Sequence, residues 1–393
     1  ENNTLFIRNP RRNQDTPYQP AELSDAEKAE LDSALLGRAL HCEFGFEPVN
    51  LNTGNFYLAQ EDFSYSDSLG TFALQRSYNS KNPGRAGSFV RDFTSLFDES
   101  ISAGEDGTLT YNREDGSSLI FTPEGNDNYK APEGYQMKLR REAVGTLQAE
   151  FSAGVQNYTV YRYVVTEENN SERIFDKDGS LIQTRGENGE TLTLNRDLNG
   201  RLTGIIREGV TMGVTATPEG FISSITMPNG GVFRYGYDNK QNLTSVTDPF
   251  GNVKRFIYDE NHRMTAWYDE NGVRVVYNTY DSEGRVTGQI NETGGRITLE
   301  YGNGKTVAAD AKGNRTVYEY DGAYRTTAIR YPDGTALKRE YQNGWMVKET
   351  DRAGVEMTFT YDSRGNITKK EGAGIRTRYA YDKKNHLTAV TDA

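Results

Sequence analysis

Cysteine, histidine and long apolar runs are all scarce in this sequence of 393 residues. The single cysteine, Cys42, excludes an intrachain disulfide. The three histidines, His41, His262 and His386, are too few and too scattered to indicate a metal site. No stretch approaches the roughly 18 consecutive apolar residues of a membrane-spanning helix. Disulfide-stapled, metal-centred and helical membrane proteins are therefore disfavoured.

Aliphatic material and positive charge are also limited. The hydrophobic fraction is only 35% even with tyrosine counted, whereas the chain has 40 glycines and 25 tyrosines. Such a composition favours stability from sheet hydrogen bonds and aromatic contacts over several compact aliphatic cores. The net charge of −11 would repel DNA, RNA and anionic membranes, so we expect no nucleic-acid partner.

Catalytic motifs are missing as well. Cys42 has no CxxC partner, and the sequence contains neither a phosphate-binding glycine loop nor a G-x-S-x-G nucleophile elbow. Asp176-Lys177-Asp178-Gly179 is similar to the start of a calcium loop but lacks its closing glutamate, so a turn is the better interpretation. We therefore predict no catalytic residue, no cofactor and no metal site, and the chain is not expected to be an enzyme.

A tyrosine recurs at a nearly constant interval in the C-terminal half, usually followed by aspartate and a small polar turn. The positions differ in turn by 21, 22, 21, 19, 21, 20 and 20, for Tyr237, Tyr258, Tyr280, Tyr301, Tyr320, Tyr341, Tyr361 and Tyr381. Weaker copies begin at Phe175, Arg196 and Ala216, which makes eleven copies in all. A fixed period of roughly 20 residues indicates one supersecondary unit repeated in tandem.

Each repeat reads as a β-hairpin. In the clearest copy Phe233, Tyr235 and Tyr237 alternate with other residues, the period of two that marks a strand. Residues 238–242 form a polar loop, residues 243–247 a second strand, and residues 248–252 a second turn, so no helix fits within the spacing. We expect the aspartate after each tyrosine to accept backbone N–H bonds in the turn.

Eleven hairpins predict roughly 22 strands and a sheet about 100 Å wide, at about 4.8 Å per strand. Strand twist must curl so wide a sheet. The predicted fold is therefore all-β, a long spiralling wall of hairpins with one short N-terminal helix. We expect the repeat tyrosines to be mostly buried and to stack ring on ring as a ladder.

The chain divides into three expected parts. Residues 1–44 hold a polar arm over 1–19 and a helix over 24–40, with a capping box from Ser24 to Glu27, and we expect this part to plug or cap the wall. The helix has one apolar stripe, formed by Leu31, Ala34, Leu35 and the stem of Arg38. Residues 45–170 form a leading domain with the first irregular hairpins, and residues 171–393 form the repeats.

An ordered set of short motifs precedes the repeats: Pro48-Val49, a Thr53-Gly54 turn, Asp62-Phe63, and Arg76 followed by Tyr78-Asn79. Together with the Tyr-Asp hairpins, this passage resembles the bacterial Rhs (rearrangement hot spot) and YD-repeat family over roughly residues 45–393. The combination is specific, because a lone Tyr-Asp pair is common but the ordered leader with eleven spaced copies is not.

The resemblance implies a wall that closes into a hollow cocoon around a C-terminal toxin domain. Such proteins are delivered into competing cells by a secretion system or from the cell surface, so we expect a secreted or surface location. This chain would be a non-catalytic N-terminal part of the shell, and its partners would be the rest of that shell, the enclosed toxin and a secretion-system component. Asp248-Pro249-Phe250-Gly251 has the letters of the family's C-terminal closing motif, but it lies mid-array as an ordinary turn.

The chain starts at Glu1 without methionine and stops mid-repeat, so we expect it to be a piece of a longer protein. Its last hairpin should then expose an edge that promotes self-association when the piece is alone.

An alternative from another class is an adhesion or carbohydrate-binding module, in which exposed tyrosines stack on sugar rings. Tyrosines that are buried or face inward would remove that platform. An enzyme built on the wall is a more distant alternative.

Overall fold

The all-β prediction is confirmed by a computed structural model, which describes residues 23–67, 70–82, 86–151 and 154–392. The leading part comprises α1 (Asp25–Ala34), β1 (Phe44–Gly45), β2 (Val49–Asn50), β3 (Tyr57–Asp67), β4 (Gly70–Asn79), β5 (Ala86–Gly87), β6 (Val90–Arg91), β7 (Phe93–Ser95) and the 3-10 helix η1 (Leu96–Asp98). β3, β4 and β7 form a small antiparallel sheet of their own. No helix in the described ranges is long and apolar enough to cross a membrane.

The remaining 28 strands form one long sheet in which each strand pairs antiparallel with the next along the chain. The sheet begins with β8 (Ser100–Ala103), β9 (Leu109–Asn112), β10 (Ser118–Gly125), β11 (Asn128–Lys130), β12 (Lys138–Phe151) and β13 (Gly154–Thr166). The repeats supply β14 (Glu172–Phe175), β15 (Leu181–Arg185), β16 (Thr191–Arg196), β17 (Leu202–Arg207), β18 (Val210–Ala216), β19 (Ile222–Thr226), β20 (Val232–Tyr237), β21 (Leu243–Thr247), β22 (Val253–Tyr258), β23 (Met264–Tyr268), β24 (Arg274–Tyr280), β25 (Val286–Asn291), β26 (Arg296–Gly302), β27 (Lys305–Asp310), β28 (Arg315–Tyr320), β29 (Thr326–Arg330), β30 (Ala336–Gln342), β31 (Trp345–Thr350), β32 (Glu356–Tyr361), β33 (Ile367–Gly372), β34 (Ile375–Tyr381) and β35 (Leu387–Asp392).

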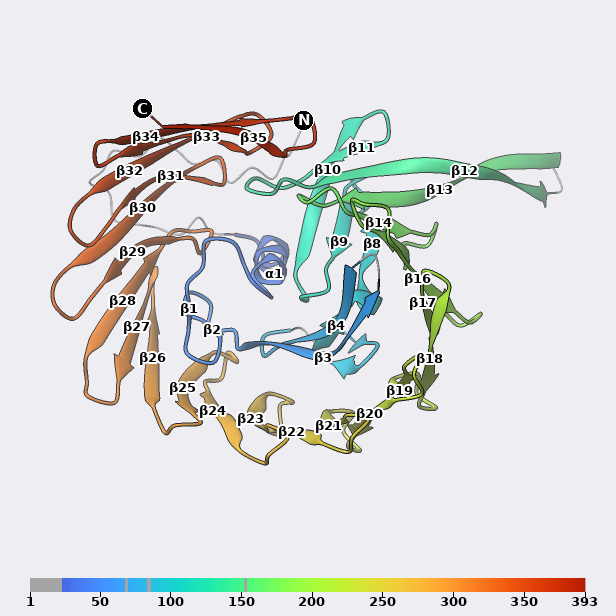
Figure 1. Cartoon of the computed structure of the whole chain (residues 1–393), viewed down its shortest axis with the longest axis horizontal. Helices are drawn as coiled ribbons and strands as arrows, with labels where there is room; N and C mark the ends of the chain where they lie inside the picture. The colour runs from blue at the N-terminus through green and yellow to red at the C-terminus, as the bar shows by residue number, and fades with distance from the viewer. Residues whose placement is uncertain (1–22, 68–69, 83–85, 152–153, 393) are drawn as a thin grey trace.

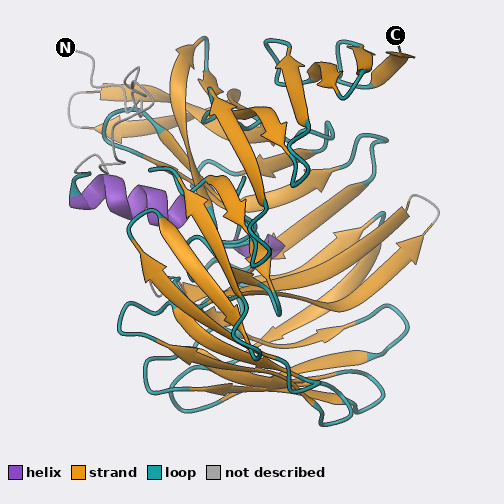
Figure 2. Ribbon diagram, turned by 90° about the vertical axis from the view of Figure 1, so that its left-hand side faces the viewer, coloured by secondary structure: helices purple, strands orange, loops and turns teal. Residues whose placement is uncertain are grey.

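The sheet curls into a wall around the leading part of the chain. Figure 1 shows its strands arranged as a ring with α1 and β1–β4 inside, and Figure 2 shows the same wall from the side. Turns of successive windings meet, because Asn170 Nδ2 donates to Lys384 O at 2.9 Å and His386 Nε2 lies 2.6 Å from Glu187 Oε1. These contacts join residues 384 − 170 = 214 and 386 − 187 = 199 positions apart, so one winding takes about ten repeats. The spiral prediction is confirmed.

The predicted role of the aspartate in the turn is also confirmed. Asp238 Oδ1 accepts the backbone N–H groups of Lys240 at 2.9 Å and Asn242 at 2.8 Å. The same pair of bonds recurs at Asp259, Asp281, Asp321, Asp362 and Asp382. The aspartate carboxylate therefore accepts turn N–H groups that have no backbone acceptor within the tight turn.

The repeat tyrosines form a ladder of hydrogen bonds. Each side chain is half-buried, and its hydroxyl donates to a backbone carbonyl of the preceding copy. The pairs are Tyr237 to Ile222, Tyr258 to Leu243, Tyr280 to Met264, Tyr301 to Val286, Tyr320 to Gly302, Tyr341 to Thr326, Tyr361 to Met346 and Tyr381 to Ile367. Seven of these bonds are 2.5–3.0 Å long, and the Tyr320 bond is 3.5 Å.

The prediction that these rings stack on one another is wrong. No ring contact joins consecutive repeat tyrosines in the described part of the chain. Consecutive copies lie two strands apart, about 10 Å, whereas aromatic pairs need centroid distances of about 4.5–7 Å. Arginines fill part of the gap: Arg263, Arg285 and Arg325 lie 4.7–5.1 Å from the ring of the next tyrosine.

The helix is shorter than predicted. Its capping box is present, with Ser24 and Glu27 bonded reciprocally, but α1 ends at Ala34 instead of reaching residue 40. Gly37 has φ +63° and donates its amide to Asn79 Oδ1 at 2.8 Å, which turns the chain out of the helix. Leu35 and Leu36 are consequently buried beyond the helix end, while α1 lies beside β10 with no buried residue of its own. The polar arm predicted for residues 1–19 lies outside the described residues.

Substitutions at Tyr258 test the ladder. Tyr258→Phe keeps the ring and loses the bond to Leu243 O, so we expect a loss of about 1 kcal/mol in unfolding free energy. Tyr258→Ala also removes the ring contact with Tyr78 and should cost about 3–5 kcal/mol. Urea unfolding followed by far-UV circular dichroism measures both changes, and equal losses for the two variants would refute the ladder.

Candidate functional site: the leading segment on the inner face of the wall

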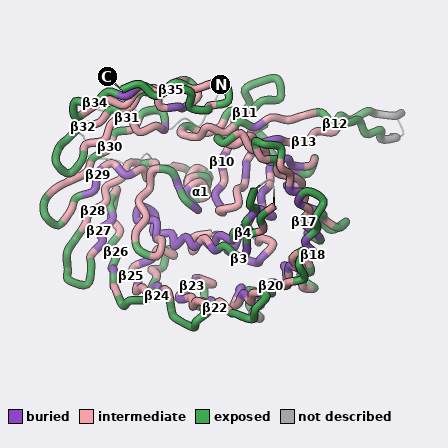
Figure 3. Tube along the Cα trace, viewed as in Figure 1, coloured by how far each residue is buried: buried purple, intermediate pink, exposed green. Residues whose placement is uncertain are grey.

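Residues 41–67, 70–82 and 86–99, here called the leading segment, lie against the inner face of the repeats. Figure 3 shows buried residues concentrated along β3 and β4 in the middle of the ring, with exposed residues on the outer turns. The core joins both parts in one cluster, in which Phe63 contacts Phe233 at 5.1 Å and Phe93 contacts Phe256 at 5.9 Å between ring centroids. The inside of this winding is thus occupied by the chain itself.

A buried ion pair is at the centre of this contact. Arg76 Nε and Nη2 donate to the two carboxylate oxygens of Asp62 at 2.6 and 2.7 Å, and both side chains are fully buried. Tyr235 of the wall donates its hydroxyl to Asp62 Oδ2 at 3.0 Å. Burial alone would lower the pKa of Arg76, but the charge and hydrogen bonds of Asp62, together with Tyr235 and Tyr258, outweigh burial and raise that pKa. The pair is therefore charged and bidentate.

Aromatic rings surround the guanidinium. Its central carbon lies 5.0–5.8 Å from four ring centroids, belonging to Phe89, Phe93, Tyr235 and Phe256. Nη1 of Arg76 has no hydrogen-bond partner. The ring faces, two from the leading segment and two from the wall, supply its attraction instead. The Arg76 site therefore ties together two parts of the chain that are far apart in the sequence.

The other motif residues are also contact residues. Tyr78 is fully buried, and its hydroxyl oxygen accepts the amide of Met264 at 2.7 Å. Asn79 accepts the amides of Gly37 and Asn55 at 2.8 Å each. Pro48, Val49 and Thr53 form the β2 turn, in which Pro48 O accepts the amide of Tyr57 and Val49 and Thr53 are buried.

Gly54 permits a close approach to the wall. Its φ is +77°, and a Cβ there would lie 2.5 Å from Cβ of Arg285 and 2.9 Å from the Tyr301 hydroxyl. Only glycine fits both the backbone conformation and the space. Its carbonyl accepts the amide of Val286 at 2.9 Å.

The contacts between the wall and the leading segment use the backbone amide at one fixed position of the repeat. Six residues after Phe175, Ala216, Tyr258, Tyr280 and Tyr320, the amide points to the leading segment instead of a neighbouring strand. The pairs are Leu181 N to Glu99 O, Ile222 N to Ser88 O, Met264 N to the Tyr78 hydroxyl, Val286 N to Gly54 O and Thr326 N to His41 O, at 2.7–3.3 Å. We call these the inner amides.

The inner amides bind the leading segment in reverse order. As the donors advance from residue 181 to 326, the acceptors retreat from residue 99 to 41. The leading segment therefore runs around the inside of the wall against the direction of the repeats. The bond from Gln289 Nε2 to Glu47 O at 2.6 Å follows the same order. The bond from Arg207 to Asp67 at 2.6 Å does not, because Asp67 lies at the tip of the β3–β4 hairpin.

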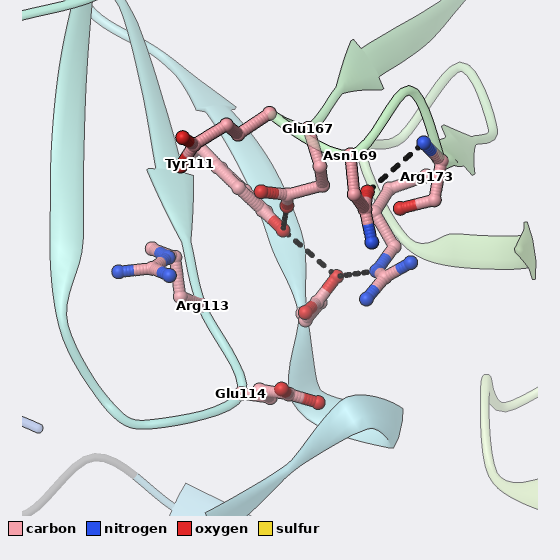
Figure 4. Close-up of a pocket in the computed structure, with 9 residues that line it drawn as sticks. Tyr111, Arg113, Glu114, Glu167, Asn169 and Arg173 are labelled. Atoms are coloured by element: carbon pink, nitrogen blue, oxygen red, sulfur yellow. Dashed lines mark hydrogen bonds and ion pairs between the residues drawn. The ribbon is translucent and has the colours of Figure 1, made fainter. Parts of the chain in front are cut away.

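A second candidate site is a charged pocket where β8–β9 meet the turn before β14 (Figure 4). It has a volume of about 460 Å³ and is lined by Glu99, Tyr111, Arg113, Glu114, Glu167, Glu168, Asn169, Ser171 and Arg173. The Tyr111 hydroxyl lies 3.0 Å from Glu99 and 3.2 Å from Glu167, and Arg173 Nε lies 3.4 Å from Glu99. These contacts join the first hairpins to the start of the repeats.

Glu99 holds a proton more firmly than an ordinary glutamate. Burial raises its pKa to about 8, and Arg173 only partly offsets this. A phenol carries one hydrogen, so Tyr111 can donate to only one of its two carboxylate neighbours; a protonated Glu99 can donate to Tyr111 in turn. The arrangement is a buried network of charged and polar groups, which is a frequent cause of shifted pKa values besides catalysis.

The sequence-predicted site residues lie in the wall and the leading segment as described. Phe175 is fully buried against Tyr111, with ring centroids 5.8 Å apart. Burial raises the pKa of Cys42 to about 12, which makes it a poor nucleophile. Within the described ranges, no three His, Cys, Asp or Glu side chains are grouped to hold a metal ion. Sequence reasoning missed the inner amides, although the apolar residue six places after each tyrosine marks them.

Two protein families match parts of the chain. The family described as a domain of unknown function, DUF6531, matches residues 46–121, and the RHS repeat family matches residues 218–253, 258–297 and 361–393. The chain therefore contains RHS repeats that follow a DUF6531 domain. Its RHS repeats form the wall, and its DUF6531 domain contains the Arg76 site. No curated protein matches the chain.

Several solved structures are similar to this RHS repeat chain. The crystal structure of TcdB2-TccC3-TEV has 12% identity over 88% of this chain and 23% of that one, with a TM-score of 0.37. TcdB2-TccC3 has 12% identity, 86% and 24% coverage and a TM-score of 0.35. The Photorhabdus luminescens Tc holotoxin pore has 12% identity, 76% and 21% coverage and a TM-score of 0.33. The chain spans about a quarter of the length of these structures.

The ion pair predicts a specific mutational pattern. Arg76→Met leaves the Asp62 carboxylate buried with only Tyr235 as a partner and should cost about 3–5 kcal/mol in unfolding free energy. Arg76→Met combined with Asp62→Leu should recover most of that loss, because no unpaired charge remains buried. Urea unfolding measures both, and a double variant no more stable than the single one would contradict this account.

Glu99 predicts a pH dependence. Its pKa is raised in the folded state, so between about pH 4.3, its ordinary value, and pH 8 the folded state holds more protons than the unfolded state. Stability should therefore fall as the pH rises through this window. Glu99→Gln should flatten the fall in melting temperature between pH 5 and pH 8.

Glu168→Gln, an exposed change at the same pocket, serves as the control and should keep the wild-type slope. An unchanged slope in Glu99→Gln would show that another group governs the pH response.

Proposed function

We propose that this chain is a non-catalytic segment of an RHS repeat shell, which encloses a toxin domain located further along the same polypeptide for delivery into competing bacteria. The observation that carries the proposal is a wall whose turns meet after about ten repeats and whose donors face inward. A wall of this kind separates an inside from an outside. The rest of the shell and the enclosed domain would be its partners.

Two further features support a container. The inner amides that bond to the leading segment end at Thr326, and the contacts of His41 reach Tyr341 and Gly344, so among the described residues the wall extends beyond the part that the leading segment covers. The matched structures carry TccC3 together with TcdB2, so an assembly with a partner subunit is part of the proposal. Export from the cytoplasm, to the medium or the cell surface, and contact with a secretion-system component follow from delivery.

The carbohydrate-binding alternative lacks a platform in the repeats. The repeat tyrosines are half-buried, and their hydroxyls are bonded to backbone carbonyls, so their faces are not free to stack on sugar rings. We therefore favour the shell over the adhesion module.

Limited proteolysis of the complete protein tests the proposal. We expect the domain downstream of the repeats to resist protease while the wall is intact, and to be cleaved once Arg76→Met has weakened the wall. Leu198→Ser, on a side chain that is fully exposed, is the control and should leave the protection unchanged. A downstream domain cleaved at the same rate in all three proteins would refute enclosure.

A further inference from the structure

We propose that the inner face of β31–β35 binds an extended segment of a second polypeptide, by the mode in which the leading segment binds the earlier repeats. The inference deepens the proposed function, on which it rests, because it assigns a binding chemistry to the inside of the wall. The interface already present supplies the template. It is a row of inner amides that donate to backbone carbonyls, beside an apolar face.

Burial at one repeat position separates the two parts of the wall. The first or second residue of the second strand of each hairpin is at most 6% exposed as far as Thr326, namely Leu181, Leu202, Ile222, Leu243, Met264, Val286, Thr306 and Thr326. The next two, Met346 and Ile367, are half-buried, and Leu387 is 52% exposed. The cover provided by the leading segment therefore stops between β29 and β31, although the repeat continues.

The backbone at Met346 and Ile367 has the geometry of the occupied positions. Their carbonyls accept the hydroxyls of Tyr361 and Tyr381 at 2.6 and 3.0 Å, as the carbonyl of Val286 accepts that of Tyr301. The ladder to the next strand begins only two residues later, at Lys348 and Lys369. Neither amide donates to the leading segment within the described residues.

The same face carries apolar side chains. Met357 and Phe359 alternate with Tyr361 along β32 and share its face, as Tyr379 does with Tyr381 along β34. The register places Leu387 opposite Tyr381 and Val390 opposite Tyr379, so both lie on this face, where they are 52% and 54% exposed. Burial of such side chains by a partner is favourable.

The chemistry selects a polypeptide as the occupant. Four of the five acceptors in the existing interface are backbone carbonyls, so binding does not depend on a particular side chain. Repeats lie about 10 Å apart and an extended chain rises about 3.3 Å per residue, so a segment crossing the strands offers a carbonyl to each repeat every three residues or so. Alternating apolar residues would face Phe359, Tyr379 and Val390. The segment would cross the face of the sheet instead of extending its edge, with main-chain bonds supplying affinity and apolar contacts that tolerate many sequences.

Fluorescence anisotropy with the 393-residue chain tests the inference. The probe is a fluorescein-labelled peptide of about 12 residues that alternates valine and threonine, long enough to cross about four repeats. Ile367→Pro removes the donor at the first residue of β33, a strand position that tolerates proline. We expect binding about fivefold weaker for Ile367→Pro than for Ile367→Val, which keeps the amide. Circular dichroism establishes that both variants fold.

A second pair of variants is independent of proline. Phe359→Ser, on the proposed face, should weaken binding, whereas Val355→Ser, a control at an exposed turn residue, should not. Equal affinities across all variants would overturn the inference. Benzoylphenylalanine placed at Met357 gives a crosslinking test. A crosslink to residues 1–22 of the same chain, and none to the probe, would also overturn the inference. Protection of the downstream domain without probe binding would defeat this inference alone and leave the shell function standing.

Discussion

The structure depends on one backbone constraint: the residue that opens the second strand of a hairpin lies ahead of the ladder to the next strand in every repeat except the one headed by Tyr301. A buried amide and carbonyl without partners would be costly, and eleven repeats would multiply that cost. The carbonyl is satisfied within the wall by the next tyrosine, as Met264 O is by Tyr280. In five repeats the amide is satisfied by the leading segment, as Met264 N is by Tyr78. The wall is therefore complete only with a ligand on its inner face.

The buried Arg76–Asp62 pair adds specificity to that general contact. Main-chain bonds between carbonyls and amides could form in any register, since every repeat presents the same groups. A bidentate ion pair among four rings, with Tyr235 on Asp62, fits at one place only. Because a mispaired charge inside the wall would be strongly unfavourable, this site fixes which repeats the leading segment meets. The inner amides then supply adhesion along the rest of its path.

The period of the tyrosines was enough to predict the hairpins, the aspartate turns and the curled sheet, because all three are local or follow from strand count. The ring-stacking prediction failed because it treated adjacent copies as adjacent strands, when another strand lies between Tyr258 and Tyr280. The helix prediction overran because the break at Gly37 is imposed by Asn79, a contact 42 residues away. The motif residues Asp62, Arg76 and Tyr78 were found by resemblance, but their pairing with Tyr235 and Met264 depends on the curvature of the wall, which no local pattern encodes.

The reversed path of the leading segment sets an order of events during synthesis. Residues 41–99 leave the ribosome before any repeat. The acceptor groups of the leading segment are therefore present when each hairpin emerges. The sequence separations closed by successive inner amides grow steadily, from 181 − 99 = 82 to 222 − 88 = 134, 264 − 78 = 186, 286 − 54 = 232 and 326 − 41 = 285. The entropy of closure rises only slowly with such lengths, and each bound hairpin shortens the free chain that the next must span. The wall can thus form in the direction of translation around the leading segment, which is synthesised first.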